Sequence, residues 1–130
     1  MGGKPTVAFL DDDPRLRSLI AEELLDEGVQ PLASSTGQDL FNCLDVEKVD
    51  LIFLDLMMPV MDGLTCLRHL NQREEKIPVL VVTSFNDEAK RQEAIDNGAT
   101  DYIIKPDLFE RLPELLDRYL NKPRNSNDMA

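Results

Sequence analysis

The sequence predicts an α/β domain in which helices cover both faces of a parallel β-sheet. The main observation is a short β-type run followed by an amphipathic helical run, a pair that occurs five times and is typical of parallel sheets. Two of the runs, residues 51–54 and 79–82, are apolar at every position, as expected for strands buried on both faces. A length of 130 residues fits one domain with one core.

The first strand is expected at residues 7–10, with a helix directly after it. Pro14 suits the first turn of that helix, and Asp13 suits the position that caps it. Gly28 is expected to end the helix. Apolar residues at helical spacing predict the face that packs on the sheet: Leu16, Leu19, Ile20 and Leu24.

The second strand, near residues 29–33, contains Pro31. A proline cannot donate a hydrogen bond to a neighbouring strand, so this strand is expected at an edge of the sheet. A short helix should follow through Leu40, Phe41 and Leu44.

The remaining elements continue the alternation. Between the two fully apolar strands, a helix should begin near residues 62–63 and run through Leu64, Leu67 and Leu70. Another helix is expected over residues 87–97 with its end at Gly98, and the last strand over residues 102–104. The final helix, expected from about residue 108 to residue 120, carries its apolar side chains on one face: Leu108, Leu112, Leu115, Leu116 and Tyr119.

Composition and charge limit the classes of function. We expect one domain over residues 5–122 and a polar tail or linker start over residues 123–130. The 25 acidic and 14 basic residues give a net charge of −11, which argues against direct binding of nucleic acid or of an anionic membrane. No apolar stretch approaches the roughly 20 residues that span a bilayer, and no signal-peptide pattern opens the chain, so we expect a cytoplasmic location.

Polar and charged side chains follow four of the predicted strands at the point where each strand ends. They are Asp11, Asp12 and Asp13 after the first strand, Asp55 after the third, Thr83 and Ser84 after the fourth, and Lys105 after the fifth. Ligands of open α/β sheets bind beyond these carboxyl ends. If the second strand lies at an edge, the first and third strands are neighbours and their carboxylates converge.

Asp11, Asp12 and Asp55 would repel one another at such short range unless a cation lay between them. Mg²⁺ suits the site because it takes one or two carboxylates and shares its other positions with water and phosphoryl oxygens. Lys105 adds a positive charge, and Thr83 a hydroxyl donor, where a phosphoryl group would sit. These groups are the ones needed to transfer a phosphoryl group to an aspartate.

Each residue also has a simpler interpretation. Helix capping alone explains Asp13, but it does not explain Asp55 after a separate strand. Lys105 could be a surface lysine, and Thr83 could cap the helix that follows it. The functional interpretation is favoured because the residues occur together.

Four motifs resemble those of the receiver domain of two-component response regulators, among them the single-domain chemotaxis regulators. They are VAFLDDDP at residues 7–14, DLIFLDLMMPVMDG at 50–63, VVTS at 81–84 and GATDYIIKP at 98–106. They occur in the family's order and cover nearly the whole chain. The resemblance implies a flavodoxin-like three-layer sandwich, with a five-stranded parallel sheet in the order 2-1-3-4-5 flanked by five helices.

The resemblance also implies how the acidic residues divide their roles. Asp55 matches the aspartate that is phosphorylated. Asp12 matches a direct ligand of Mg²⁺, and Asp11 matches its acidic partner. Met57 would offer its backbone carbonyl to the metal.

Three further positions match groups that respond to the phosphoryl group. Thr83 and Lys105 match the hydroxyl and the ammonium that hold it, and Tyr102 matches an aromatic residue that turns inward when the threonine moves. In the family the bond between Lys105 and Pro106 is typically cis. The output surface is commonly formed by the fourth helix, the fifth strand and the fifth helix.

The resemblance implies a switch and not an enzyme with an external substrate. A sensor histidine kinase or a phosphotransfer protein would supply phosphohistidine, and the chain would catalyse only its own phosphorylation and dephosphorylation. A phosphorylation-dependent homodimer is a further expectation. Two alternatives stay open: a pseudo-receiver that binds partners without being phosphorylated, and an aspartate-dependent phosphatase of the haloacid dehalogenase type. The latter typically has Asp-x-Asp after its first strand, which this chain does not match.

Overall fold

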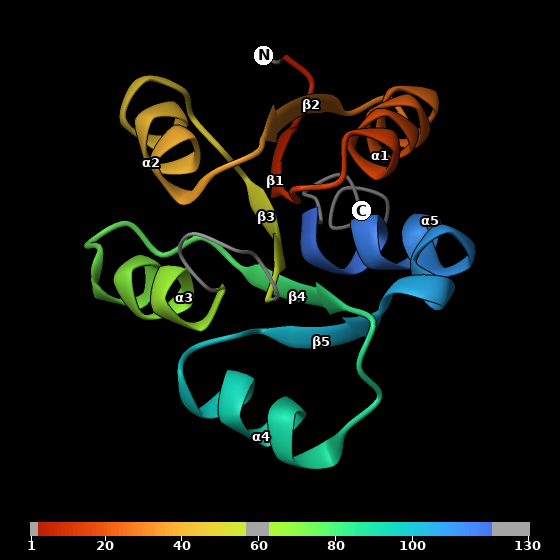
Figure 1. Ribbon diagram of the computed structural model, residues 1–130. Helices are drawn as coiled ribbons and strands as arrows, with labels where there is room; N and C mark the ends of the chain where they lie inside the picture. Colours follow the sequence, from red (N-terminus) through yellow and green to blue (C-terminus); the bar gives the residue numbers. More distant parts are fainter. Residues whose placement is uncertain (1–2, 57–62, 121–130) are drawn as a thin grey trace, which may run out of the picture.

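A five-stranded parallel sheet lies between two layers of helices (Figure 1). The computed structural model describes residues 3–56 and 63–120. The strand order is β2-β1-β3-β4-β5, and the strands are β1 (Thr6–Leu10), β2 (Gln30–Ser34), β3 (Leu51–Asp55), β4 (Val79–Thr83) and β5 (Asp101–Ile104). The predicted fold class and strand order are therefore confirmed.

The helices alternate with the strands as predicted: α1 (Pro14–Asp26), α2 (Gly37–Val46), α3 (Gly63–Gln72), α4 (Glu88–Asp96) and α5 (Leu108–Leu120). A 3₁₀ turn, η1 (Lys105–Asp107), joins β5 to α5. Helices α1 and α5 cover one face of the sheet, and α2, α3 and α4 pack toward the other (Figure 1). The carboxyl ends of all five strands therefore open at the same edge of this sandwich.

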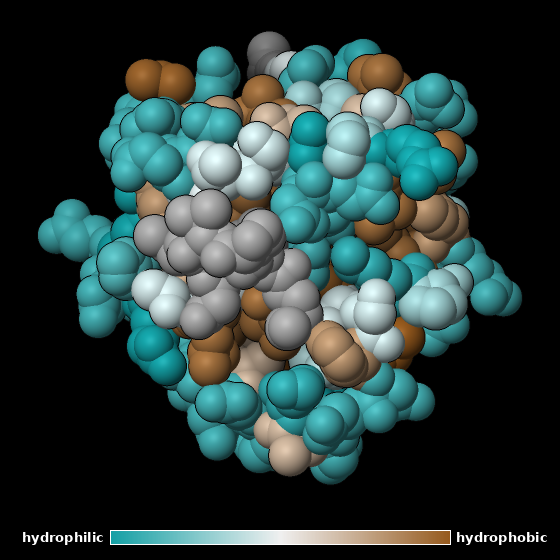
Figure 2. All heavy atoms as spheres, viewed as in Figure 1, coloured by the Kyte–Doolittle hydropathy of each residue, from teal (hydrophilic) through white to brown (hydrophobic). Residues whose placement is uncertain are grey.

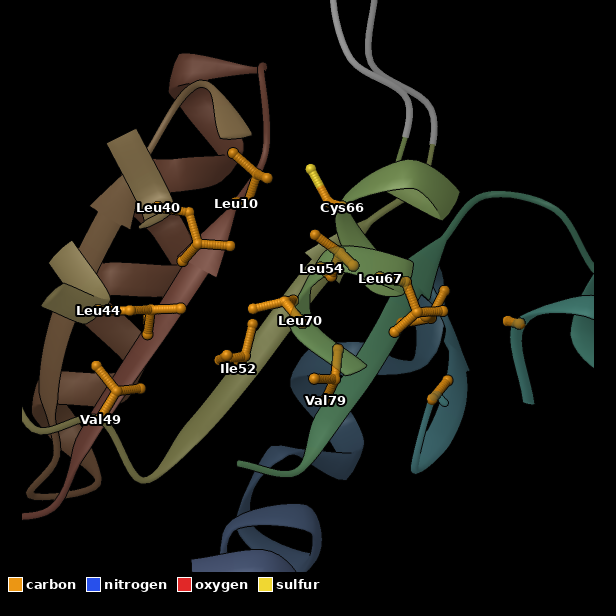
Figure 3. Close-up of a cluster of buried hydrophobic side chains, with 14 of the residues drawn as sticks. Leu10, Leu40, Leu44, Val49, Ile52, Leu54, Cys66, Leu67, Leu70 and Val79 are labelled. Carbon is orange, nitrogen blue, oxygen red and sulfur yellow. The ribbon is translucent and has the colours of Figure 1, made fainter. Parts of the chain in front are cut away.

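Alternate side chains of the strands enter two apolar clusters, one on each face of the sheet. In β3, Ile52 and Leu54 face α2 and α3 (Figure 3), whereas Leu51 and Phe53 face α1 and α5. Every residue of β3 and of β4 is buried, as predicted from their unbroken apolar runs. Burial of one such side chain stabilises the fold by about 1.5–3 kcal/mol.

Strand β2 lies at an edge of the sheet, as its proline predicted. Among the strands of the described residues it pairs with β1 alone, and Pro31 stands beside Val7 in the register. The ends of α1 are also as expected. The Asp13 side chain accepts a hydrogen bond from the N–H of Arg15, Pro14 opens the helix, and Gly28 follows it with a φ of 79°.

One apolar residue of α1 departs from the prediction. Leu16, Ile20 and Leu24 pack toward the sheet, but Leu19 is 50% exposed. The three packed residues recur every four positions, and Leu19 falls to the side of that stripe. Most of the surface in Figure 2 is hydrophilic, with apolar residues scattered over it. Within residues 3–56 and 63–120, no helix is long and apolar enough to span a membrane.

Candidate functional site

The carboxyl ends of β1 and β3 bring three carboxylates together. Asp11 and Asp12 follow β1, and Asp55 is the last residue of the adjacent strand β3. One oxygen atom from each of the three side chains lies within 4.8 Å of the others. The edge position of β2 makes β1 and β3 neighbours, which is why the side chains meet.

The three carboxylates differ in exposure. Asp11 is 2% exposed and Asp55 is 3% exposed, whereas Asp12 lies at the surface. The Asp12 carboxylate forms neither a hydrogen bond nor an ion pair with any residue that the structure describes. It is therefore open to a ligand from solvent.

Lys105 supplies a positive charge to the two buried carboxylates. Its Nζ lies 3.2 Å from Oδ2 of Asp11 and 3.4 Å from Oδ2 of Asp55. Burial alone would lower the pKa of Lys105, but the charges of Asp55 and Asp11 outweigh it and raise this pKa above its usual value. The ammonium form is thereby favoured.

The peptide bond between Lys105 and Pro106 is trans, so the expected cis bond is not found. Lys105 opens the turn η1, and a proline in the first turn of a helix fits without a cis bond. The lysine side chain reaches Asp55 from this geometry.

Asp11 is held by polar contacts at each of its backbone and side-chain groups. Its N–H donates to the carbonyl of Ser34 at 3.2 Å, and its Oδ1 accepts from the N–H of Asp13 at 2.9 Å. Its carbonyl accepts from Nη1 of Arg17 at 2.8 Å. The sequence prediction missed Arg17; the available signal was a basic residue shortly after an acidic cluster, in the helix that follows it.

Thr83 and Tyr102 both contact the backbone of Phe85. Thr83 is fully buried at the end of β4, and its hydroxyl accepts a hydrogen bond from the Phe85 N–H at 3.3 Å. The Tyr102 hydroxyl donates to the Phe85 carbonyl at 2.9 Å. Burial and, second, the charge of Asp87 raise the pKa of Tyr102, and the Thr83 hydroxyl offsets part of this. The two residues are thus linked through one segment after β4.

Gly63, the first residue of α3, packs directly against the end of β3. Its N–H donates to the carbonyl of Leu56 at 2.8 Å. A Cβ atom at this position would collide with the carbonyl oxygen of Asp55 and with the Cα of Leu56. Glycine is therefore required for α3 to approach the strand that carries Asp55.

The donor set fits a hard divalent cation. Carboxylate oxygens are the ligands that Mg²⁺ prefers, and three of them lie within 4.8 Å of one another. Met57, whose backbone carbonyl was expected to be a further ligand, lies outside the described residues.

Comparison with known proteins points to one family. A family model described as the response regulator receiver domain matches residues 7–117. The transcriptional regulatory protein AruR of Pseudomonas aeruginosa is 35% identical over 123 residues, which cover 88% of this chain and 50% of that protein. The DNA-binding transcriptional regulator NtrC of Klebsiella pneumoniae is 29% identical over 124 residues, covering 91% of this chain and 26% of that protein.

Solved structures give the same answer. The chemotaxis protein CheY4 of Vibrio cholerae superposes with a TM-score of 0.84 at 26% identity, covering 90% of this chain and 99% of that one. The BeF3-activated N-terminal receiver domain of RstA from Klebsiella pneumoniae gives 0.82 at 30% identity, with coverage of 90% and 99%. The chain spans about half the length of AruR and about a quarter of NtrC. Because the family match runs from β1 into α5, the chain belongs to the family of response regulator receiver domains.

Proposed function

We propose that Asp55 accepts a phosphoryl group from phosphohistidine in a Mg²⁺-dependent reaction, and that the chain signals by the change that follows. The observation that carries the proposal is the position of Asp55. Its buried carboxylate lies against the Lys105 ammonium, and its oxygen is within 4.8 Å of ligand oxygens of Asp11 and Asp12. A nucleophile, a cation and a carboxylate pair for a metal are thus in one place.

In the proposed reaction, one Asp55 oxygen attacks phosphorus and the bond from phosphorus to the histidine nitrogen breaks. The imidazole leaves with the electron pair of that bond. Bound Mg²⁺ would neutralise charge on the carboxylates and on the phosphoryl oxygens. Lys105 already contacts Asp55, so its ammonium needs only a short movement to hold a phosphoryl oxygen.

Thr83 and Tyr102 are the proposed switch. A Thr83 hydroxyl that turned to a phosphoryl oxygen would give up its bond to the Phe85 N–H, and Tyr102 is bonded to the same residue. A change at Asp55 would therefore reach the segment between β4 and α4. The surface of α4, β5 and α5 would then shift its population of conformations.

The partners proposed for this chain follow from the phosphoryl chemistry. A sensor histidine kinase or phosphotransfer protein is the proposed donor, and these donors imply action in the cytoplasm. A downstream effector, or a further domain such as the longer relatives carry, is the proposed receiver of the signal. We propose a functional unit over residues 5–122 and a tail or linker start at 123–130; this boundary lies outside the described residues. We also propose a homodimer after phosphorylation. In this proposal the chain catalyses only its own phosphorylation and dephosphorylation and turns over no external substrate.

The test is incubation with Mg²⁺ and acetyl phosphate, followed by the intact mass of the protein. Wild type should gain one phosphoryl group, about 80 Da, and only with Mg²⁺ present. Asp55→Asn should gain none, and Asp26→Asn, which removes an exposed carboxylate from α1, should behave as wild type. An unchanged mass in folded wild type would favour the pseudo-receiver, whereas steady release of phosphate from a generic ester would favour the phosphatase.

A further inference from the structure

Arg17 contacts the backbone at the edge of the acidic site. Its guanidinium Nη1 donates to the backbone carbonyl of Asp11 at 2.8 Å, and its side chain is partly buried. Among the residues that the structure describes, no carboxylate lies within 4.0 Å of this guanidinium. The charged guanidinium therefore donates to a backbone oxygen and not to one of the three consecutive aspartate side chains that follow β1.

The bonded carbonyl belongs to the peptide unit that joins Asp11 to Asp12. A peptide unit is planar, so a bond that holds its oxygen also holds the N–H and the Cα of Asp12. Asp12 has no side-chain partner among the described residues, so its backbone alone fixes the Cα from which its carboxylate projects and the direction of the Cα–Cβ bond. The side chain of Asp11, by contrast, is fixed separately by Asp13 and Lys105.

We propose that Arg17 is a positioning residue of the metal site. It holds the peptide unit from which Asp12 projects, and it thereby aims an exposed and otherwise unpartnered carboxylate at the cation. The inference rests on the proposed Mg²⁺ site. Groups that orient a metal ligand from outside the coordination shell contribute substantially to metal affinity.

The charge of Arg17 and its hydrogen bond have opposite expected effects on Mg²⁺ affinity, so substitution of Arg17 can distinguish them. A positive charge near the site repels Mg²⁺, so loss of the charge alone would strengthen Mg²⁺ binding. Loss of the hydrogen bond would loosen Asp12 and weaken binding. Arg15 offers a matched control, because it is an exposed arginine in the same turn of α1.

The experiment is a titration of the 130-residue chain with Mg²⁺, followed by amide shifts in ¹H–¹⁵N NMR spectra. We expect Arg17→Met to raise the half-saturating Mg²⁺ concentration about tenfold. Arg17→Lys keeps a charged donor and should recover most of the wild-type affinity. Arg15→Met removes the same charge without the bond, so its half-saturating concentration should be unchanged or slightly lowered.

The outcomes separate this inference from the proposed function. Mg²⁺ binding by Arg17→Met as tight as that of wild type, or tighter, would overturn the positioning role and leave the metal site standing. A purely structural role would lower the unfolding midpoint without changing half-saturation, and would also overturn it. Wild type that binds no Mg²⁺ would overturn both. If Arg17→Met does not fold, Arg17→Ala, which also removes both the charge and the donor, takes its place with the same expected rise in half-saturating concentration.

Discussion

The ammonium nitrogen of Lys105 lies 3.4 Å from Oδ2 of Asp55, although the two residues are 50 positions apart in the chain. The same nitrogen lies 3.2 Å from Oδ2 of Asp11, so one cation serves two buried carboxylates. A buried carboxylate that loses its partner is costly, because burial has removed most of its water. Lys105 and a bound divalent cation would thus neutralise the same two groups.

Lys105→Met should lower the free energy of unfolding by about 1–2 kcal/mol, less than for a fully buried pair because the lysine side chain keeps 24% of its exposure. Mg²⁺ should reduce this loss, since the metal replaces the missing charge and stabilises the folded form by binding to it. Urea unfolding with and without Mg²⁺ measures both effects.

Lys48→Met is the control for that substitution. Lys48 pairs with Asp50 at 3.4 Å, but its side chain is 85% exposed, so the change should be within about 0.5 kcal/mol and should not respond to Mg²⁺. Equal sensitivity of Lys105→Met and wild type to Mg²⁺ would show that the lysine and the metal do not share the carboxylates.

Gly63→Ala should destabilise the fold by about 1–3 kcal/mol, the usual cost of forcing an atom into packed space. The added Cβ would collide with the backbone of Asp55 and Leu56, which cannot move aside as a flexible side chain could. Because Asp55 would shift with the backbone, phosphorylation by acetyl phosphate should also slow. Gly3→Ala, whose added Cβ meets no atom of the described residues within 4 Å, should change neither quantity. A Gly63→Ala protein with wild-type stability would mean that α3 can retreat freely from β3.

The sequence predicts at which strand ends the site residues lie, but it does not predict the hydrogen bonds and packing contacts that fix their positions. Asp55 and Thr83 end unbroken apolar runs, and Pro31 marks the edge that makes β1 and β3 neighbours, so convergence follows from strand order alone. The hydrogen bond from Arg17 to Asp11 and the close approach of Gly63 to β3 depend on how α1 and α3 pack against the sheet. These tertiary contacts produce no local sequence pattern from which they could be predicted.

The end of β5 is a second place where the sequence predicts a residue's position but not its detailed geometry. The motif places Lys105 correctly near Asp55, but the peptide bond after it is trans. Helix α5 also contains Pro113, which removes one backbone hydrogen bond, yet the helix continues because its apolar face packs on the sheet: Leu108, Leu112, Leu115 and Leu116. At Pro113, burial of the apolar face of α5 outweighs the lost hydrogen bond.

Ser34→Ala should leave stability unchanged or raise it by about 1 kcal/mol. The Ser34 hydroxyl is buried, with 3% of the residue exposed, and it has no hydrogen-bond partner among the residues that the structure describes. A buried hydroxyl without a partner costs free energy that an alanine methyl does not. Thr36→Ala, two residues on, should do the reverse and cost about 1 kcal/mol, because its hydroxyl caps α2 by accepting from the Asp39 N–H. Destabilisation of similar size in both variants would mean that water satisfies Ser34.

Stability should fall as the pH rises above about 10, because three groups hold their protons more tightly in the folded state. Burial raises the pKa of Tyr102, and burial with a hydrogen bond to Asp101 raises the pKa of Tyr119. The charges of Asp55 and Asp11 outweigh burial and raise the pKa of Lys105. Each contribution to stability is complete below the pKa of the unfolded chain and is lost as the pH passes through the higher folded pKa.

The tyrosine part of this loss can be observed directly, since the chain has two tyrosines and no tryptophan. Phenolate absorbance of the native protein should appear at higher pH than that of the urea-unfolded chain. Tyr119→Phe leaves Tyr102 as the single reporter, and Tyr102→Phe leaves Tyr119. Each variant should also lose less stability than wild type between pH 9 and 11, because it lacks one of the groups that titrate there. A native titration that coincides with the unfolded one would show that neither hydroxyl is held by the bonds to Phe85 and Asp101.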